Sequence, residues 1–417
     1  MEENKSNKKI WIGIAAAVLI ILVVLLVILK PFQRSAAAPA ETGVNPPAAA
    51  EIEMDDSPPA ADPEPTPAME PTAETVEVET TETATETAAE ADQAVDPASV
   101  IKASNLSQLQ EVITLEGHAG EVLEIAFSPD GSLLASASTD NNVMVWNTED
   151  GSLLYTLEGH TDTVLSLAFS PDGELLLSGS RDRTVKKWQL SDGSLLDTIS
   201  RIHALRAMEL AFSPDGFLFA VANDIGFVEV RRTDTGILYK TIVQTDSFGH
   251  KEDFVSTWGL SFTPDGESIL VGAGRNCCGG SLRVYDVDTY VDSDILIGMN
   301  VRIHDLVYSS DGETLGVVFL PLAVFWTVDA DNGDMIESFE GHSYMVNSVA
   351  FSPDGSLIVS GSEDWHVYIW DTSTGEILGD LKNREAAINS VAFSPGGTTI
   401  AVASDDGTIG LWQVSGE

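Results

Sequence analysis

The sequence predicts an all-β domain built from seven similar units, preceded by one apolar helix and an acidic linker. Two observations indicate the β domain. A turn ending in Gly recurs every 42 to 50 residues over the C-terminal three quarters of the chain. Between these turns, apolar and polar residues alternate in short runs, as in strands with one buried face. The first hundred residues show neither feature and form two segments of different composition.

Residues 10–29 (IWIGIAAAVLIILVVLLVIL) predict a transmembrane helix. They are twenty residues without a charge, the length that spans a bilayer. Three Lys in residues 1–9 and two basic residues after the segment slightly favour a cytoplasmic N-terminus. A cleaved signal peptide is the alternative, with Ala-Ala-Ala at 36–38, but the apolar run is longer than a usual signal core. We expect an uncleaved, single-pass signal anchor, a tail of residues 1–9 in the cytoplasm and the rest outside it.

Residues 30–104 predict a disordered linker. Ala, Pro, Thr and Glu dominate, and no Lys or Arg lies between Arg34 and Lys102. Apolar residues are too sparse to offset the entropy lost on ordering, while Pro and like charges stiffen the chain. We expect this linker to hold residues 105–417 clear of the membrane.

The charge balance excludes one class of partner. Net charge is −44, and residues 103–417 alone contain 47 acidic and 15 basic residues. A surface this acidic repels phosphates, so we expect no nucleic acid partner. Basic partners or divalent cations suit it better, although acidity that only keeps the chain soluble is the simpler interpretation.

Seven turns set the period of the repeat, and their glycines are Gly131, Gly173, Gly216, Gly266, Gly312, Gly355 and Gly397. This period is typical of the four-stranded blades of a β-propeller. The chain ends just after the third strand of unit seven. An alternating strand at 109–115 (LQEVITL) precedes the first unit, and we expect it to complete the last blade and hide its edge.

Three units contain the same four polar or aromatic residues at the same spacing. They are His118, Ser136, Asp140 and Trp146 in unit one, His160, Ser178, Asp182 and Trp188 in unit two, and His342, Ser360, Asp364 and Trp370 in unit six. Unit six also begins with Gly-His and ends with Trp-Asp, and the whole pattern resembles the WD-repeat β-propeller family. With its predicted anchor, the chain resembles a membrane-anchored, bacterial member of that family. The resemblance covers about residues 105–417. It implies that the four residues hydrogen-bond to one another and lock each blade.

The other units depart from this pattern. Unit three has Val230 and unit four Tyr285 in place of Trp, unit five lacks the His and Asp, and unit seven has Arg384 in place of His. These blades must depend more on apolar packing.

The repeated Ser, His and Asp do not predict catalysis. An enzyme needs one site, whereas these residues recur at fixed positions in three units, and no phosphate loop, HExxH motif or nucleophile elbow is present. Acidic runs at 286–294 and 329–334 do not match a calcium loop and are better explained as solvated turns. We therefore expect no catalytic residue, no cofactor and no metal.

Unit four is the least regular unit. Extra residues fall at about 245–254 and in the loop 272–280, which contains Arg275, Asn276, Cys277 and Cys278. In the family these loops lie on the face that usually binds partners, so they are candidates for binding, although surface loops also tolerate insertion without function. The adjacent Cys pair, the only cysteines, forms a vicinal disulfide, bonds to another chain or remains two free thiols.

Aromatic and basic residues in two other loops are further candidates for partner binding. Tyr344, Trp365 and His366 lie in loops of unit six, and Arg181 and Arg183 occupy the matching loop of unit two. Exposed aromatic side chains are typical interface anchors, and the alternative is that Trp365 packs onto its own blade.

We therefore expect a membrane-tethered, non-catalytic scaffold that binds a protein or peptide through the loop face. The alternative is an extracytoplasmic propeller enzyme or metal-dependent carbohydrate-binding protein that uses the central channel. Glu124, Glu209, His304 and Asp305, on the first strands of their units, are the residues that indicate it.

Overall fold

The computed structural model describes residues 99–200, 206–243, 256–274, 280–289, 292–299, 302–381 and 385–415. No helix within these ranges is long and apolar enough to cross a bilayer. The predicted anchor at 10–29 and most of the predicted linker lie outside them, as do Arg275, Asn276, Cys277, Cys278 and most of the predicted insertion at 245–254.

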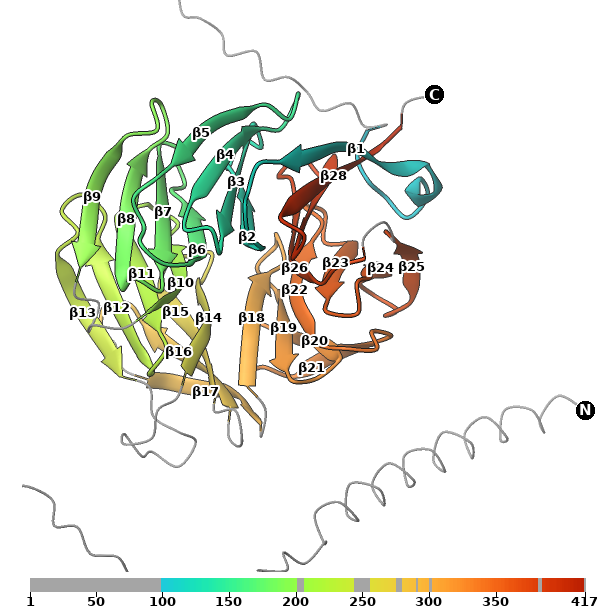
Figure 1. The fold of residues 1–417 in the computed structure, drawn as a ribbon. Helices are drawn as coiled ribbons and strands as arrows, with labels where there is room; N and C mark the ends of the chain where they lie inside the picture. The colour runs from blue at the N-terminus through green and yellow to red at the C-terminus, as the bar shows by residue number, and fades with distance from the viewer. Residues whose placement is uncertain are drawn as a thin grey trace, which may run out of the picture. The chain divides into compact units, whose positions relative to one another are not determined.

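The described residues form seven four-stranded antiparallel sheets, arranged as the blades of a propeller (Figure 1). Each blade runs outward from its first strand at the centre. Blades one to three are β2 (Val122–Phe127), β3 (Leu133–Ser138), β4 (Val143–Asn147), β5 (Leu153–Leu157); β6 (Val164–Phe169), β7 (Leu175–Ser180), β8 (Thr184–Gln189), β9 (Leu195–Ser200); and β10 (Ala207–Phe212), β11 (Leu218–Asn223), β12 (Phe227–Arg232), β13 (Leu238–Val243).

The second half of the ring follows the same order. Blades four to six are β14 (Ser256–Phe262), β15 (Ser268–Gly274), β16 (Gly280–Asp286), β17 (Asp292–Met299); β18 (Arg302–Tyr308), β19 (Thr314–Leu320), β20 (Val324–Asp329), β21 (Met335–Glu340); and β22 (Val346–Phe351), β23 (Leu357–Ser362), β24 (Val367–Asp371), β25 (Ile377–Asp380). Blade seven combines β26 (Ile388–Phe393), β27 (Thr399–Ser404) and β28 (Thr408–Val414) with β1 (Leu109–Glu116). The predicted all-β, seven-bladed architecture is confirmed.

Seven glycine turns join the first and second strands, and all lie at one end of the propeller, which we call the turn face. The glycine of each turn has φ between +67° and +75°, the left-handed region that favours Gly. Neighbouring turns pack together. For example, a Cβ added at Gly131 would lie 3.3 Å from Pro395 Cδ in the turn of blade seven. The opposite end, formed by loops that join the second to the third strand and one blade to the next, is the loop face.

The hydrophobic core lies between the blades. Each cluster of buried side chains takes members from neighbouring sheets, as where Val145 of blade one meets Leu176 and Trp188 of blade two. The strand register corrects one prediction: Arg231, not Val230, lies at the Trp position of blade three, and Val230 matches Val145 of blade one. Val230 lies with Tyr285 of blade four in one such cluster. Packing of this kind makes each blade depend on its neighbours.

The N-terminal strand closes the ring, as predicted. β1 pairs antiparallel with β28 from Leu109 opposite Val414 to Glu116 opposite Thr408. The short helix η1 (Leu106–Gln108) precedes it, and the Gln108 carbonyl accepts the Ser415 N–H. Further upstream, Ile101 is 1% exposed in a core cluster and its N–H donates to the Gly397 carbonyl on the turn face. The packed region thus includes Ile101, which the sequence places in the linker.

Candidate functional site

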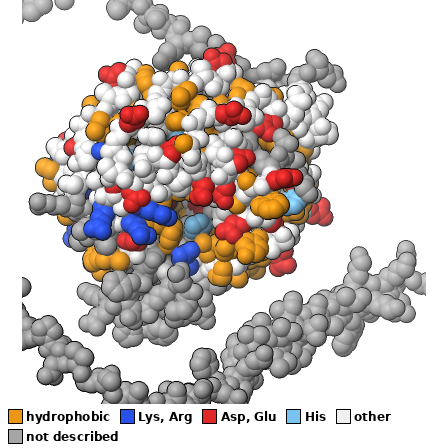
Figure 2. Space-filling view, in the orientation of Figure 1, with side chains coloured by type: hydrophobic (Ala, Val, Ile, Leu, Met, Phe, Trp, Pro, Cys, Tyr) orange, Lys and Arg blue, Asp and Glu red, His pale blue; other side chains and the backbone are white. Residues whose placement is uncertain are grey.

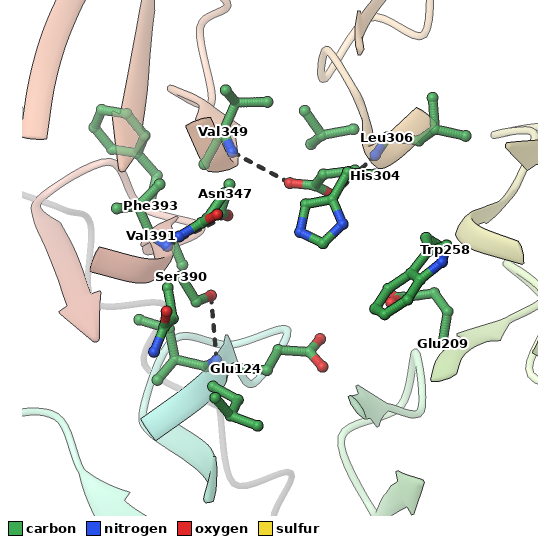
Figure 3. A pocket seen from close by; sticks show the side chains of 18 of the residues that line it. Glu124, Glu209, Trp258, His304, Leu306, Asn347, Val349, Ser390, Val391 and Phe393 are labelled. Atoms are coloured by element: carbon green, nitrogen blue, oxygen red, sulfur yellow. Dashed lines mark hydrogen bonds between the residues drawn. The ribbon is translucent and has the colours of Figure 1, made fainter. Parts of the chain in front are cut away.

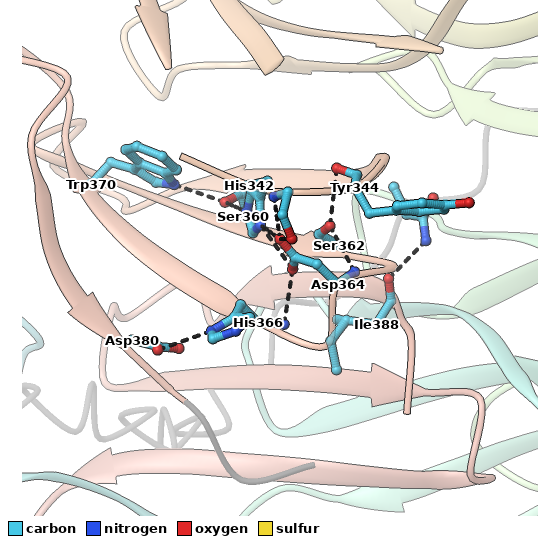
Figure 4. A network of polar contacts seen from close by, with 11 residues as sticks. His342, Tyr344, Ser360, Ser362, Asp364, His366, Trp370, Asp380 and Ile388 are labelled. Carbon is cyan, nitrogen blue, oxygen red and sulfur yellow. Dashed lines mark hydrogen bonds and ion pairs between the residues drawn. The ribbon is translucent and has the colours of Figure 1, made fainter. Parts of the chain in front are cut away.

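The predicted polar residues form the same hydrogen-bonded network in blades one, two and six. In blade six, Ser360 Oγ lies 2.7 Å from both Trp370 Nε1 and His342 Nε2, and His342 Nδ1 lies 3.1 Å from the Asp364 carboxylate (Figure 4). Asp364 also accepts the backbone N–H of Ser343. The residues are His118, Ser136, Asp140 and Trp146 in blade one and His160, Ser178, Asp182 and Trp188 in blade two.

The direction of each hydrogen bond follows from its partners. The indole N–H donates to the Ser oxygen, so the Ser hydroxyl donates to His Nε2 and His Nδ1–H donates to the carboxylate. This requires a neutral imidazole. Burial lowers the pKa of His160 and His342 despite the nearby carboxylates. The carboxyl pKa of Asp364 is lowered because its hydrogen bonds and His342 outweigh the burial that raises it. With every partner satisfied inside the blade, these residues brace the fold.

The loop face of blade six presents two exposed aromatic side chains. Trp365 is 52% exposed and Tyr344 57% exposed. The two loops that contain them are hydrogen-bonded, because Ser362 Oγ donates to the Tyr344 carbonyl and Glu363 N–H to the Met345 carbonyl. Trp365 therefore does not fold back fully onto its own blade.

Trp365 also has an unusual backbone conformation, with φ +71°. The same loop position is Asn141 in blade one and Arg183 in blade two, also at positive φ, but Gly226 and Gly407 in blades three and seven. A bulky side chain is disfavoured there, since the left-handed region costs a non-glycine residue about 1–2 kcal/mol. The position therefore holds an exposed aromatic ring where the turn itself favours Gly or Asn.

The other predicted binding residues differ in availability. His366 is half-buried and its Nδ1 lies 3.0 Å from Asp380 on β25, so it pairs within its own blade (Figure 4). Arg181 and Arg183 are exposed on the loop face. Figure 2 shows acidic side chains spread over the visible face, with Lys and Arg gathered in one part of it.

A central channel with a cavity of about 630 Å³ runs between the first strands. Every first strand has a β-bulge near its start, which turns one side chain toward the channel. These side chains are Leu123, Leu165, Met208, Trp258, His304, Asn347 and Asn389. The first four of these seven are apolar or aromatic and the last three polar, so the channel wall has two chemically different sides.

In several blades, the side chain of the residue after the bulge accepts a hydrogen bond from the first strand of the next blade. Glu124 Oε2 accepts the N–H of Leu167 on the next first strand, at 3.0 Å, and Asp305 Oδ2 accepts that of Val349, at 3.2 Å. Ser390 Oγ does the same for Ile125. Glu209 occupies the equivalent position, yet its carboxylate forms no hydrogen bond with any described residue. The sequence-predicted Glu124, Glu209, His304 and Asp305 therefore meet in one cavity (Figure 3).

Four segments of the chain match one family model, "WD domain, G-beta repeat": residues 109–147, 151–189, 333–371 and 375–413. Each begins with the last strand of one blade and ends with the third strand of the next, so the sequence repeat and the structural closure coincide. The chain is a WD-repeat β-propeller. The unmatched blades three, four and five all lack the polar network, whereas blade seven is matched although it has Arg384 in place of His.

Curated relatives are distant. WD repeat-containing protein SL1-17 of Schistosoma mansoni is 27% identical over 169 residues, 40% of this chain and 52% of that protein. Periodic tryptophan protein 2 of Arabidopsis thaliana is 26% identical over 267 residues, 63% of this chain and 23% of that protein. Eukaryotic translation initiation factor 3 subunit I of Lodderomyces elongisporus is 25% identical over 290 residues, 61% and 79% respectively. The chain spans about half or less of the first two, and these likenesses support the repeat family alone.

Burial gives this propeller's channel unusual protonation states. It raises the pKa of Glu124 to about 8 and of Asp305 to about 6, the latter against three hydrogen bonds that lower it. Burial and the charges of Glu124 and Asp305 raise the pKa of Glu209 well above its ordinary value. Burial and Arg302 lower the pKa of His304 to about 4, so its ring is neutral. The channel therefore holds carboxyl groups that are protonated more readily than surface ones.

The sequence did not single out Trp258, Asn347 or Asn389 as channel residues. Asn347 and Asn389 donate to backbone carbonyls of neighbouring blades, and Arg302 lies 4.6 Å above the ring of Trp258. Aligning the first strands of all units on the bulge position of His304 would have identified these three residues in the sequence. Within the described ranges, no three His, Cys, Asp or Glu side chains come close enough to hold one metal ion.

Proposed function

We propose that this WD-repeat propeller is a membrane-tethered, non-catalytic scaffold that binds a protein or peptide through its loop face, chiefly at blade six. The observation on which this rests is Trp365, an exposed aromatic ring held at positive φ beside exposed Tyr344. Backbone strain of this kind persists where function favours it, and aromatic side chains dominate protein interfaces.

Blade two supplies the polar part of the proposed surface. Arg181 and Arg183 are exposed cations on an acidic domain, and guanidinium groups bind carboxylates in a bidentate manner. A partner segment with an apolar side chain for blade six and acidic residues for blade two fits this distribution. The surrounding acidic surface would repel segments that are acidic throughout.

The path of the chain supports the tether. The N-terminal segment joins the propeller at the turn face, where Ile101 N–H donates to the Gly397 carbonyl and Val100 lies beside Gly397. The loop face is the opposite end of the ring. A linker attached at the turn face leaves the loop face open, so an anchor at residues 10–29 would not compete with the partner.

The partner surface is tested by capture experiments with the full-length chain. We expect Trp365→Asn and Tyr344→Ala each to lose partners that the wild type retains, by roughly tenfold or more in affinity. Asn is the matched replacement because Asn141 has the same backbone conformation. Phe217→Ala, which removes a 74% exposed aromatic ring from the turn face, is the control. Partners kept by both loop variants would refute the proposal.

The anchor is tested by expression in bacteria. We expect the full chain to resist carbonate extraction from membranes and its propeller to be digested by protease in intact spheroplasts. A chain starting at residue 30 should be released in soluble form. Full protection of the propeller would show that it lies in the cytoplasm, contrary to the proposal.

The alternative function, an enzyme or a metal-dependent carbohydrate-binding protein that uses the channel, remains our second prediction. A generic hydrolase screen and thermal unfolding with and without calcium test it. Turnover, or a calcium-dependent rise in unfolding temperature, that is lost in Glu209→Gln would favour this alternative.

A further inference from the structure

We propose that the central channel binds a primary ammonium group between Glu124, Glu209 and the ring of His304. The site is separate from the loop-face surface, and the inference does not depend on the proposed partner. Its ligand class is a free di- or polyamine, or a lysine side chain inserted by a partner.

The three residues leave binding capacity unused inside the cavity. Glu124 uses Oε2 for the N–H of Leu167, and its other carboxylate oxygen forms no hydrogen bond with the described residues. Glu209 forms no hydrogen bond with the described residues. The edge of the His304 ring points into the cavity (Figure 3). Its Nδ1 is shielded from solvent, so Nε2, which forms no hydrogen bond with the described residues, is the nitrogen that a ligand can reach. Acceptors of this kind are available to a ligand that donates hydrogen bonds.

The charge of the cavity favours a cation. Its lining contains four carboxyl groups, from Glu124, Glu209, Asp305 and Glu363, and one Arg, Arg181, at the loop-face rim. The other neighbouring cation, Arg302, lies 4.6 Å over Trp258. His304 is neutral because burial and Arg302 lower its pKa.

The geometry selects among cations. The described His, Cys, Asp and Glu side chains do not converge closely enough for a metal ion, and about 630 Å³ is far more than a bare ion fills. A guanidinium group is planar and prefers one carboxylate in a bidentate pair. An ammonium group directs three N–H donors to separate acceptors, and Glu124, Glu209 and the neutral imidazole of His304 line the cavity from three different strands.

Binding is linked to proton release. Burial raises the pKa of Glu124 to about 8, and burial with the neighbouring carboxylates raises that of Glu209. An ammonium ligand favours the ionised carboxylates, so these protons leave when it binds. Affinity should therefore rise with pH up to about pH 8. Asp305, with a pKa of about 6, ionises within this range and adds to the rise, whereas His304 stays neutral. Arg302, Arg181 and Glu363 are the other charged groups around the site.

The experiment is isothermal titration of the full-length chain with 1,4-diaminobutane, spermidine and Nα-acetyl-lysine-N-methylamide, in two buffers of different ionisation heat. We expect at least one amine to bind with proton release. Glu209→Gln should weaken binding roughly ten- to a hundredfold, as expected when a charge-assisted contact is lost. Gln keeps the shape of the side chain. Glu149→Gln, an exposed acid on the outer part of blade one, is the matched control and should bind as the wild type does.

Each result is decisive. Binding of the free amines alone identifies a soluble ligand, and binding of the lysine derivative alone identifies a partner side chain. The proposal is overturned if no amine binds, if Glu209→Gln and Glu124→Gln bind like the wild type, or if Nα-acetyl-arginine-N-methylamide, titrated in the same way, binds as tightly as the lysine derivative. Unchanged thermal unfolding of the variants excludes loss of fold as the cause.

Discussion

At the scale of single residues, one serine decides whether a network stabilises its blade. Ser360 Oγ serves two buried groups at once, the Trp370 indole N–H and His342 Nε2. Trp370 is fully buried, so neither partner has water as a substitute. Blades without this serine also lack the complete set, as in blade three, where Val221 lies at the position of the Ser and Arg231 at that of the Trp. The network is present as a whole or replaced by apolar packing, because a half-satisfied network is costly.

We predict that Ser360→Ala lowers the free energy of unfolding by about 2–4 kcal/mol, since two buried nitrogens lose their partner. Urea denaturation followed by tryptophan fluorescence measures this. Ser373→Ala removes an exposed hydroxyl in the next turn and should cost under about 1 kcal/mol. Equal losses in the two variants would mean that the network adds nothing beyond a surface turn.

Replacing Trp365, unlike replacing Ser360, should not destabilise the fold. We predict that Trp365→Asn leaves the free energy of unfolding unchanged or raises it by up to about 1 kcal/mol, because Asn tolerates the left-handed conformation better. The same denaturation experiment tests it. A large destabilisation would show that the ring packs as part of the core and is not kept for binding.

At the scale of elements, the N-terminal segment stabilises the ring before β1 begins. Ile101 is buried among Leu357 and Val359 of blade six and Ile400 of blade seven. Asn105 fixes the intervening turn, because its side chain accepts the Lys102 N–H and donates to the Val100 carbonyl. This segment therefore bridges two blades that β1 alone does not join.

We predict that Ile101→Ala lowers the free energy of unfolding by about 2–4 kcal/mol, the usual effect of emptying a buried aliphatic site. Val112→Ala on β1 is the control, since Val112 is 40% exposed and should cost under about 1 kcal/mol. Thermal or urea unfolding of the full chain compares them. Similar values would place Ile101 outside the core in solution.

The strands were predictable because local chemistry determines them. The Gly turns with positive φ and the alternating strands between them define each blade, and the strand at 109–115 could be assigned to blade seven from its pattern. Ile101 could not be recognised, since one apolar residue in a polar segment gives no period. The channel ring was missed because the β-bulge shifts the alternation by one residue, so Trp258 and Asn347 do not follow the period of two.

At the scale of the whole molecule, two groups of titrating residues act on stability in opposite directions. Asp140, Asp182 and Asp364 have lowered pKa values, so the stability they give is present at neutral pH and is lost as pH falls. His160 and His342, also with lowered pKa, add to this loss below about pH 6.5. The channel acids Glu124 and Asp305 have raised pKa values, so folding keeps their protons and loses stability as pH rises.

We predict that Glu124→Gln combined with Glu209→Gln gains stability over the wild type as pH rises from about 5 to about 8. In that window the folded wild type retains protons that the unfolded chain releases, given the ordinary pKa of 4.5 and the folded value of about 8 for Glu124. Urea denaturation across the window measures the difference. A stability difference that is constant with pH would contradict the protonation states described for the channel.

The place where the chain enters the ring also has a mechanical consequence. A pull on Ser99 acts at the turn face, first on the buried Ile101 and then on the start of β1 at Leu109. β1 runs from the turn face toward the loop face. If the loop face is held by a partner, the tension between the two faces therefore acts along the axis of this strand. The hydrogen bonds between β1 and β28 are perpendicular to the strands and would be loaded together in shear, rather than opened one by one. The strand that closes the ring is therefore oriented to resist tension between the two faces.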